Sequence, residues 1–272
     1  MTPSEQNSIR TKPGQRNAFD GVWGIRLRRF WTALSFTVFP IGALLFGLVY
    51  APLLWLLIWN RERRQRIARA SVSKLFGFFF RFMGVTLHDF HIFGDLVGNL
   101  ERPALIVANH ITLVDAVCLM WLFPGADCVV KGSHWRNPIM MAAVRAAGYL
   151  RNDDDEHLLT EAVRRLTDGG SMVLFPQGTR VRAEEQPELK RGAAVLALRS
   201  HVDLLPIRIE VSPLTLRKGE PWSSIPERRV HFHIHILDRI APAEYLASSN
   251  PSRREEREAS HAITERLREL LL

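Results

Sequence analysis

Residues 104–115 read Ala-Leu-Ile-Val-Ala-Asn-His-Ile-Thr-Leu-Val-Asp. The five apolar residues at the start predict a buried strand that ends at Asn109, and the apolar run that continues to Phe123 predicts a helix. His110 therefore falls in a strand-to-helix turn. In open α/β sheets, ligands bind outside the carboxyl ends of the strands. This stretch thus predicts a fold class and also the position of a site.

Further strands and helices alternate along the rest of the chain. Strands are expected at 128–130, 149–151, 172–175, 204–211 and 229–237, and helices at 139–147, 156–167, 193–200 and from 251 onward. Strands that alternate with helices of about ten residues are typical of an α/β domain. We therefore expect residues 85–272 to form a mixed, largely parallel sheet flanked by helices.

An uncharged apolar stretch extends from Phe30 to Trp59. Core helices rarely run this long without a charge, and no signal-peptide cleavage site follows, so a membrane-embedded helical segment is expected. As one straight helix it would extend about 45 Å, which exceeds the ~30 Å hydrocarbon core. Pro40 and Pro52 can break a helix, and arginines flank both ends. These features favour a re-entrant helical hairpin over the alternative, a tilted single span.

Three regions are therefore expected along the chain. Residues 1–29 form a flexible basic tail, residues 30–84 form membrane-anchoring helices, and residues 85–272 form the α/β domain. The phenylalanine-rich run at 75–83 is either an interfacial helix, with Arg81 at the headgroups, or a core helix. Because positive charge favours the inner side of a membrane, the α/β domain is expected on the cytoplasmic face of the cell inner membrane.

The chain is basic, with 36 Lys and Arg against 28 Asp and Glu and a formal net charge of +8. Such a charge suits nucleic acid, an anionic membrane or an anionic substrate. No zinc knuckle, helix-turn-helix signature or repeat of basic and aromatic residues is present, so no nucleic acid partner is expected. Cys118 and Cys128 form no CxxC pair and are expected to be buried thiols in a reducing cytosol.

His110 and Asp115 are candidates for proton transfer. Residues five apart in a regular helix point about 140° away from each other, so contact requires His110 to lie in the turn. A carboxylate on one ring nitrogen then leaves the other nitrogen to take a proton from an alcohol. The alcohol oxygen can attack a thioester directly, and the chain has no Gly-x-Ser-x-Gly elbow for a protein nucleophile. A purely structural turn histidine is the alternative.

A second run, Phe175-Pro176-Gln177-Gly178-Thr179-Arg180, follows another predicted strand. Together with Asn109-His110-x-x-x-x-Asp115, it resembles the motifs of the glycerolipid acyltransferases related to 1-acylglycerol-3-phosphate acyltransferase. Weaker blocks, in the family's order, extend the resemblance over residues 85–240, namely Lys131, 148–151, 190–194 and 205–207.

The resemblance implies a membrane-bound enzyme that moves a fatty acyl group from acyl-CoA or acyl-carrier protein to a hydroxyl of a lysophospholipid-like acceptor. By position, His110 would be the base and Asp115 its orienting partner. Gly178 and Thr179 would shape the acceptor pocket. A phosphate would be bound by basic residues, namely Arg180, Arg151 and Lys131.

The expected partners are membrane lipids and the acyl donor, which is a co-substrate, so no cofactor is expected. No metal is expected either. His231, His233 and His235 alternate along a predicted strand and face one side, but no facing carboxylate is evident from the sequence, and a polar sheet face is favoured. The oligomeric state is left open.

Gln177 stands where the family usually has glutamate. The change keeps the size but replaces one acceptor oxygen with an amide donor. Either the site needs only one hydrogen bond here, or the acceptor differs, for example an amino-acid lipid or a specialised polyene-type lipid. In the second case, Gln177→Glu is expected to shift acceptor preference more than turnover. A non-catalytic lipid-binding protein on the same fold is a further alternative, against which the intact His110 and Asp115 argue.

Overall fold

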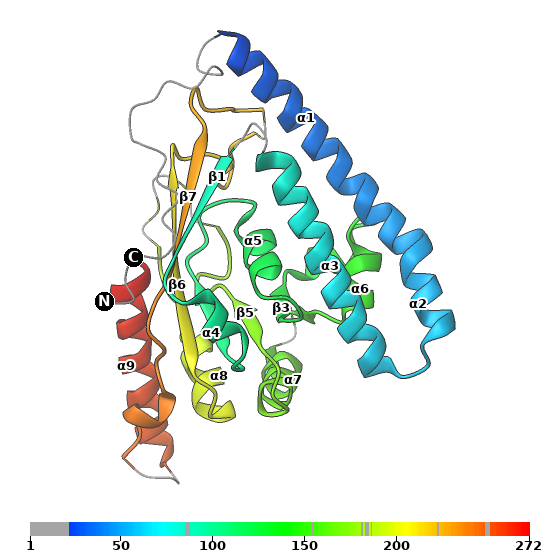
Figure 1. The fold of residues 1–272 in the computed structure, drawn as a ribbon. Helices are drawn as coiled ribbons and strands as arrows, with labels where there is room; N and C mark the ends of the chain where they lie inside the picture. Colours follow the sequence, from blue (N-terminus) through cyan, green and yellow to red (C-terminus); the bar gives the residue numbers. More distant parts are fainter. Residues whose placement is uncertain are drawn as a thin grey trace, which may run out of the picture.

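The computed structural model describes residues 22–84, 88–153, 155–180, 182, 185, 187–221, 223–247 and 251–272. An N-terminal helical hairpin leans against one side of an α/β domain (Figure 1). The outer arm of the hairpin consists of α1 (Val22–Leu45), a π-helical turn η1 (Phe46–Tyr50) and α2 (Ala51–Leu57). Its inner arm is α3 (Arg61–Gly84).

The hairpin reverses at a different place from the one expected. The outer arm stays helical through Pro40 and Pro52. Its 34-residue segment Gly24–Leu57 is long and apolar enough to cross a membrane. The π-helical turn η1 lies directly before α2, where Pro52 lacks the N–H that would continue the α-helical pattern. The expected break within the apolar stretch is therefore wrong, because the chain reverses at residues 58–60.

The N-terminal helix begins before residue 29, where the tail was expected to end. Residues 22–29 belong to α1, and the remainder of the expected tail, residues 1–21, lies outside the described residues.

The run at 75–83 is a core helix, the second of the two alternatives. In this part of α3, Phe80 is 2% exposed and stacks on Trp121 at a ring-centroid distance of 5.5 Å, while Phe78 faces outward.

A seven-stranded sheet in the order β1-β7-β6-β2-β5-β3-β4 forms the centre of the α/β domain. Its strands are β1 (His88–Phe93), β2 (Leu105–Ala108), β3 (Asp127–Val130), β4 (Leu150–Arg151), β5 (Met172–Leu174), β6 (Leu204–Ser212) and β7 (Val230–Ile236). Neighbouring strands pair in parallel except β6 and β7, which are antiparallel. The predicted mixed, largely parallel sheet is confirmed, whereas β1 is a strand that the sequence analysis does not predict.

Helices cover both faces of this sheet (Figure 1). One face packs against α3, α5 (Asp115–Leu122) and α6 (Met141–Ala147), and the other against α7 (Asp155–Thr167), α8 (Gly192–Ser200) and α9 (Arg253–Leu271). Within β2, Ile106 and Ala108 join the first core, and Leu105 and Val107 join the second. Shorter helical segments are α4 (Leu96–Leu100), η2 (Gly132–Trp135) and η3 (Pro242–Tyr245). The strand β2 is thus buried on both faces, as its continuous apolar run predicts.

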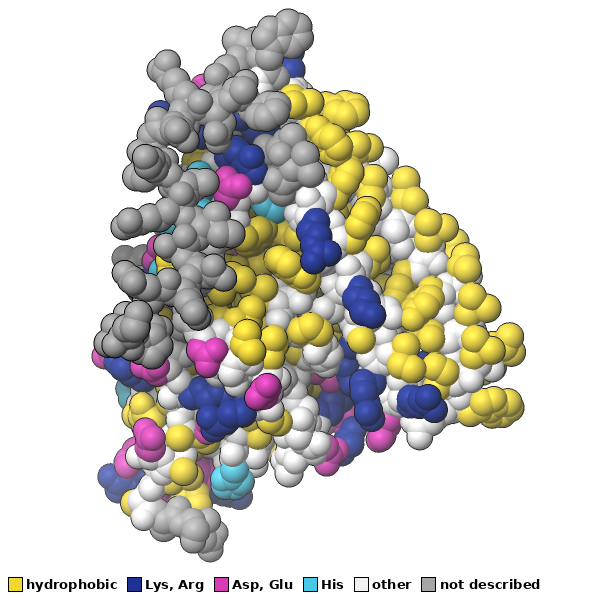
Figure 2. Space-filling model, viewed as in Figure 1, with side chains coloured by type: hydrophobic (Ala, Val, Ile, Leu, Met, Phe, Trp, Pro, Cys, Tyr) yellow, Lys and Arg dark blue, Asp and Glu magenta, His cyan; other side chains and the backbone are white. Residues whose placement is uncertain are grey.

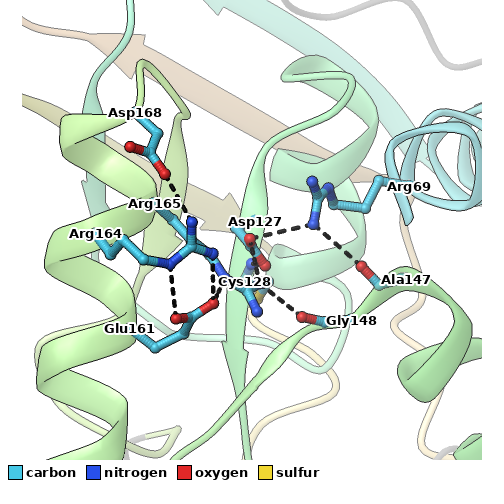
Figure 3. Close-up of polar contacts among 9 residues, drawn as sticks. All are labelled: Arg69, Asp127, Cys128, Ala147, Gly148, Glu161, Arg164, Arg165 and Asp168. Atoms are coloured by element: carbon cyan, nitrogen blue, oxygen red, sulfur yellow. Dashed lines mark hydrogen bonds and ion pairs between the residues drawn. The ribbon is translucent and has the colours of Figure 1, made fainter. Parts of the chain in front are cut away.

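A buried carboxylate ties the helical hairpin to the α/β domain (Figure 3). Asp127 is 4% exposed, and its Oδ2 accepts hydrogen bonds from Arg69 Nη1 of α3 at 3.2 Å and Arg165 Nη1 of α7 at 2.6 Å. The two guanidinium groups also donate to the carbonyls of Ala147 and Gly148 at the end of α6. A single carboxylate therefore pairs with two arginines, of which Arg165 also pairs with Glu161, and this cluster links three helices to β3.

Replacing Asp127 with asparagine should lower the free energy of unfolding by about 3 kcal/mol, because Arg69 loses the carboxylate it pairs with and Arg165 keeps only Glu161. Urea unfolding of the purified protein measures this loss. The matched control is Asp168→Asn, which removes an exposed partner of Arg164 and should cost less than about 1 kcal/mol. Equal losses for the two variants would contradict a special role for Asp127.

Candidate active site

His110 and Asp115 meet at the carboxyl end of β2. The Nδ1 atom of His110 lies 3.1 Å from Asp115 Oδ2. Asp115 is the first residue of α5 and its side chain is 0% exposed, whereas the His110 side chain is 17% exposed. The turn between β2 and α5 is not helical, so the angle that a regular helix imposes on such a pair does not apply. The contact expected from the sequence is therefore formed.

Backbone and hydroxyl donors hold the Asp115 carboxylate in place. Its Oδ2 accepts hydrogen bonds from the backbone N–H groups of Ile111 at 2.6 Å and Thr112 at 2.7 Å. Its Oδ1 accepts a hydrogen bond from the Thr112 hydroxyl. These donors replace the water that burial removes, and they fix the direction in which the carboxylate faces the imidazole. The sequence analysis missed Thr112, although a threonine three residues before a turn carboxylate is a usable signal.

The environment of the His110 ring selects one tautomer. A carboxylate at Nδ1 requires a proton there, so the Nε2 atom of the neutral ring carries the lone pair. Nε2 forms no hydrogen bond with any residue that the structure describes. The ring also stacks on Phe175 with centroids 4.2 Å apart and an interplanar angle of 24°. This geometry suits an imidazole that accepts a proton from an incoming alcohol.

Two amide side chains fix the backbone around His110. Gln177 Oε1 accepts a hydrogen bond from the His110 backbone N–H at 2.6 Å, and Gln177 is 9% exposed. Asn109 pairs with the backbone of Ile209 on β6, donating to its carbonyl at 2.9 Å and accepting from its N–H at 2.7 Å. Because a glutamate oxygen could also accept the His110 N–H, this contact favours a tolerated substitution at position 177 over a direct contact with the acceptor.

The Gly178–Arg180 turn follows β5, which is the neighbour of β2 in the sheet. Gly178 has a φ of +72°, a conformation that strains other residues. Arg180 Nη1 donates to the carbonyls of Leu216 at 3.0 Å and Arg217 at 3.3 Å. Thr179 is exposed. The two motifs therefore come together at one edge of the sheet through neighbouring strands.

Lys190 lies beside this turn, and the sequence analysis did not select it as a site residue. A methyl group added to Gly178 would lie 3.5 Å from Lys190 Nζ. The backbone N–H of Lys190 donates to the carbonyl of Pro176 at 2.9 Å, which holds the lysine next to the motif. The turn thus has an ammonium group on one side and the Arg180 guanidinium at its end.

Lys131 and Arg151 lie farther along the same edge, after β3 and within β4. These strands are two and three positions away from β2, or about 10 and 14 Å at the usual strand spacing. Lys131 is exposed. The Arg151 guanidinium donates to both carboxylate oxygens of Asp153, at 2.8 and 2.7 Å. The structure therefore places these two predicted phosphate ligands on the correct edge but not next to His110.

Both cysteines lie in the core near the site. Burial, and then the nearby Asp115 carboxylate, raises the pKa of Cys118 well above its ordinary value. Burial, and then Asp127, raises the pKa of Cys128 to about 12. Both thiols therefore stay protonated at neutral pH, and neither supplies a thiolate nucleophile.

Known proteins are similar to this chain in sequence. The profile of the acyltransferase family matches residues 85–210, which contain both motifs. The 1-acyl-sn-glycerol-3-phosphate acyltransferase of Limnanthes douglasii is 28% identical over 207 residues, which is 74% of this chain and 70% of that enzyme. The enzyme of the same name from Cocos nucifera is 21% identical over 258 residues, or 85% and 82% of the two chains. This chain is therefore similar to these acyltransferases over most of its length.

The fold of the acyltransferase is shared as well. The crystal structure of the 1-acyl-sn-glycerophosphate acyltransferase PlsC from Thermotoga maritima matches it with a TM-score of 0.63 at 20% identity, covering 91% of this chain and 96% of the other. The resemblance and the fold class expected from the sequence are thereby confirmed. The protein is an O-acyltransferase, so the non-catalytic alternative is set aside.

Proposed function

We propose that the acyltransferase moves a fatty acyl group from acyl-CoA or acyl-carrier protein to a free hydroxyl of a lysophospholipid-like acceptor, with lysophosphatidate as the first candidate. The observation that carries this proposal is the contact between His110 Nδ1 and Asp115 Oδ2 next to the turn that ends in Arg180. The relatives from Limnanthes and Cocos are 1-acyl-sn-glycerol-3-phosphate acyltransferases, which supports a glycerophosphate acceptor.

The reaction needs one base that later acts as an acid. His110 Nε2 takes the proton of the acceptor hydroxyl while the hydroxyl oxygen attacks the thioester carbonyl and forms a carbon–oxygen bond. Asp115 stabilises the imidazolium through the Nδ1–H. The tetrahedral adduct then expels the thiolate as the carbon–sulfur bond breaks, and the imidazolium returns its proton to sulfur. An ester and a free thiol leave, and His110 is neutral again.

The acceptor phosphate would lie at the Gly178–Arg180 turn. Arg180 uses Nη1 on two carbonyls, and its other guanidinium N–H groups form no hydrogen bond with the residues described. A guanidinium fork can grip two phosphate oxygens, and the Lys190 ammonium adds a second positive charge beside the turn. Both groups would anchor the headgroup and leave the hydroxyl to His110.

Arg180→Ala should raise the KM for lysophosphatidate by about 10- to 100-fold, the loss expected for hydrogen bonds to a charged group. Steady-state assays with labelled acyl-CoA measure the change, with Arg199→Ala, an exposed arginine of α8, as the control. Monoacylglycerol, which lacks the phosphate, provides a second comparison. An equal rise in KM for that acceptor would show that Arg180 only supports the loop at Leu216.

The helical hairpin would hold the enzyme at a membrane. Apolar side chains line the outer arm in Figure 2, and Leu48 is 73%, Trp55 70% and Leu57 73% exposed. In the most apolar 18-residue stretch of this helix, only 22% is buried inside the protein. Arginines of α3, among them the exposed Arg61 and Arg63, follow the turn and could meet anionic headgroups. We place the hairpin in the cell inner membrane and the α/β domain on its cytoplasmic face.

Replacing both Leu48 and Leu56 with glutamate should reduce binding to anionic vesicles by at least about tenfold, because each charge opposes insertion by a few kcal/mol. Flotation of the purified protein with vesicles measures binding. Val97→Glu is the matched control, since Val97 is 71% exposed but lies on α4 of the α/β domain. Equal losses for the two variants would contradict a membrane role for the hairpin.

A direct test of the function compares acceptors with the wild-type enzyme in nanodiscs. Labelled acyl-CoA and labelled acyl-carrier protein are each offered with lysophosphatidate, other lysophospholipids, an amino-acid lyso-lipid or monoacylglycerol. We expect lysophosphatidate to be acylated fastest. Faster acylation of the amino-acid lipid would show that the proposed acceptor is wrong but that the proposed acyl transfer is right. Transfer to none of these lipids would contradict the proposal.

A further inference from the structure

A row of imidazoles lies on the face of the sheet opposite the α3 core. His231, His233 and His235 alternate along β7 with Phe232 and Ile234, which are buried in that core. His91 of β1 is the parallel partner of His233, and their ring centroids are 5.0 Å apart. The polar sheet face expected from the sequence is thus present.

The structure adds the facing carboxylate that the sequence did not reveal. Glu210 of β6 is the antiparallel partner of His233, two register positions from the partner of His235. The ligand atoms of Glu210, His233 and His235 all lie within 4.8 Å of one another. Two ligand atoms on one zinc ion lie at most about 4.2 Å apart, since each sits about 2.0–2.2 Å from the metal. In a tetrahedral site the separation is about 3.4 Å, so side-chain rotations that shorten each distance by up to about 1.4 Å bring all three onto one ion.

The hydrogen bonding of these side chains leaves a ring nitrogen of His235 and a carboxylate oxygen of Glu210 near each other. His235 Nε2 is buried and has no hydrogen-bond partner among the residues described, although Glu210 Oε2 lies 3.6 Å away. The second carboxylate oxygen, Oε1, lies 3.1 Å from Arg208 Nε. Arg208 thus engages one oxygen of Glu210 and leaves the other on the histidine side. A buried ring nitrogen without a partner costs free energy, and a metal ion would remove that cost.

We propose that Glu210, His233 and His235 bind one divalent transition-metal ion, with Zn²⁺ as the best match. Two imidazoles and one carboxylate form a set of borderline ligands that suits zinc and leaves one position for water. The ion joins the last residues of β6 to β7, at the only antiparallel pairing among the described strands. It therefore reinforces the part of the sheet where the strand direction changes.

Isothermal titration of Zn²⁺ into chelator-treated full-length protein, purified without a polyhistidine tag, tests this site. We expect one ion per chain, an affinity in the micromolar range or tighter, and a higher melting temperature with the ion present. His235→Ala and Glu210→Gln should each weaken binding about tenfold or more. His231→Ala, on the same face but outside the set, should leave the affinity within about twofold.

Substitution with Co²⁺ keeps the test decisive if a variant does not fold. Wild-type protein should then show the visible absorption of a four- or five-coordinate cobalt centre with nitrogen and oxygen ligands, and Zn²⁺ should displace it. Failure to bind either ion, or equal affinities for His235→Ala and the wild type, would overturn the proposal. A loss caused by His231→Ala as large as that caused by His235→Ala would also overturn it, because the ligand set would then be wrong.

Discussion

Replacing His110 with alanine is expected to reduce kcat by about 10²- to 10⁴-fold, the usual contribution of a positioned general base. The reason is local. His110 carries the ring nitrogen whose tautomer is set by Asp115, and both cysteines are kept protonated by burial. No cysteine thiolate is therefore available to take over the proton of the acceptor hydroxyl.

Binding and chemistry must be separated to interpret this variant. His261→Ala is the matched control, since the side chain of His261 on α9 is 69% exposed. The variant and the control should float equally with vesicles and melt at similar temperatures. His110→Ala should differ only in labelled acyl transfer. Transfer at the wild-type rate by His110→Ala would remove His110 from the mechanism.

Asp115→Asn is expected to reduce kcat by a similar factor, about 10²- to 10⁴-fold, although it preserves the size of the side chain. The amide oxygen would take the place of Oδ2, because the backbone N–H groups of Ile111 and Thr112 require an acceptor there. The imidazolium formed during proton transfer would then lose the negative charge that stabilises it. The assay is the same labelled acyl transfer, accompanied by thermal unfolding.

Thr112→Val is the matched control for Asp115→Asn. It removes the hydroxyl that donates to Asp115 Oδ1 but leaves the carboxylate and its contact with His110. We expect a loss of less than about tenfold in kcat, because the negative charge beside His110 is retained. If Thr112→Val were as damaging as Asp115→Asn, the position of the carboxylate would matter more than its charge.

Local sequence patterns predicted the elements whose contacts lie close together in the chain. The strand before Asn109 and the contact between His110 and Asp115 depend only on residues 104–115, so the pattern sufficed. The helix at Gly192–Ser200 and its flanking strand β6 were found for the same reason. The continuity of the outer arm through Pro40 was not predictable in this way, because packing of α1 against α3 and α6 supports the helix there.

Contacts across the sheet depend on the order of the strands, which could not be predicted from local sequence patterns. The hydrogen bond from the His110 backbone to Gln177 exists because β2 and β5 are neighbours. The same order places Arg151 three strands from β2, which a match to a family motif could not show. Glu210 faces His233 only through the antiparallel register of β6 and β7.

The central claim is that His110 and Asp115 act as one unit in proton transfer. Its most direct test is the kcat of the double variant His110→Ala with Asp115→Asn, measured beside both single variants. Because Asp115 acts through the imidazole, the double variant should be within about threefold of His110→Ala. If the two single losses instead multiplied, the residues would act independently and the account would be contradicted.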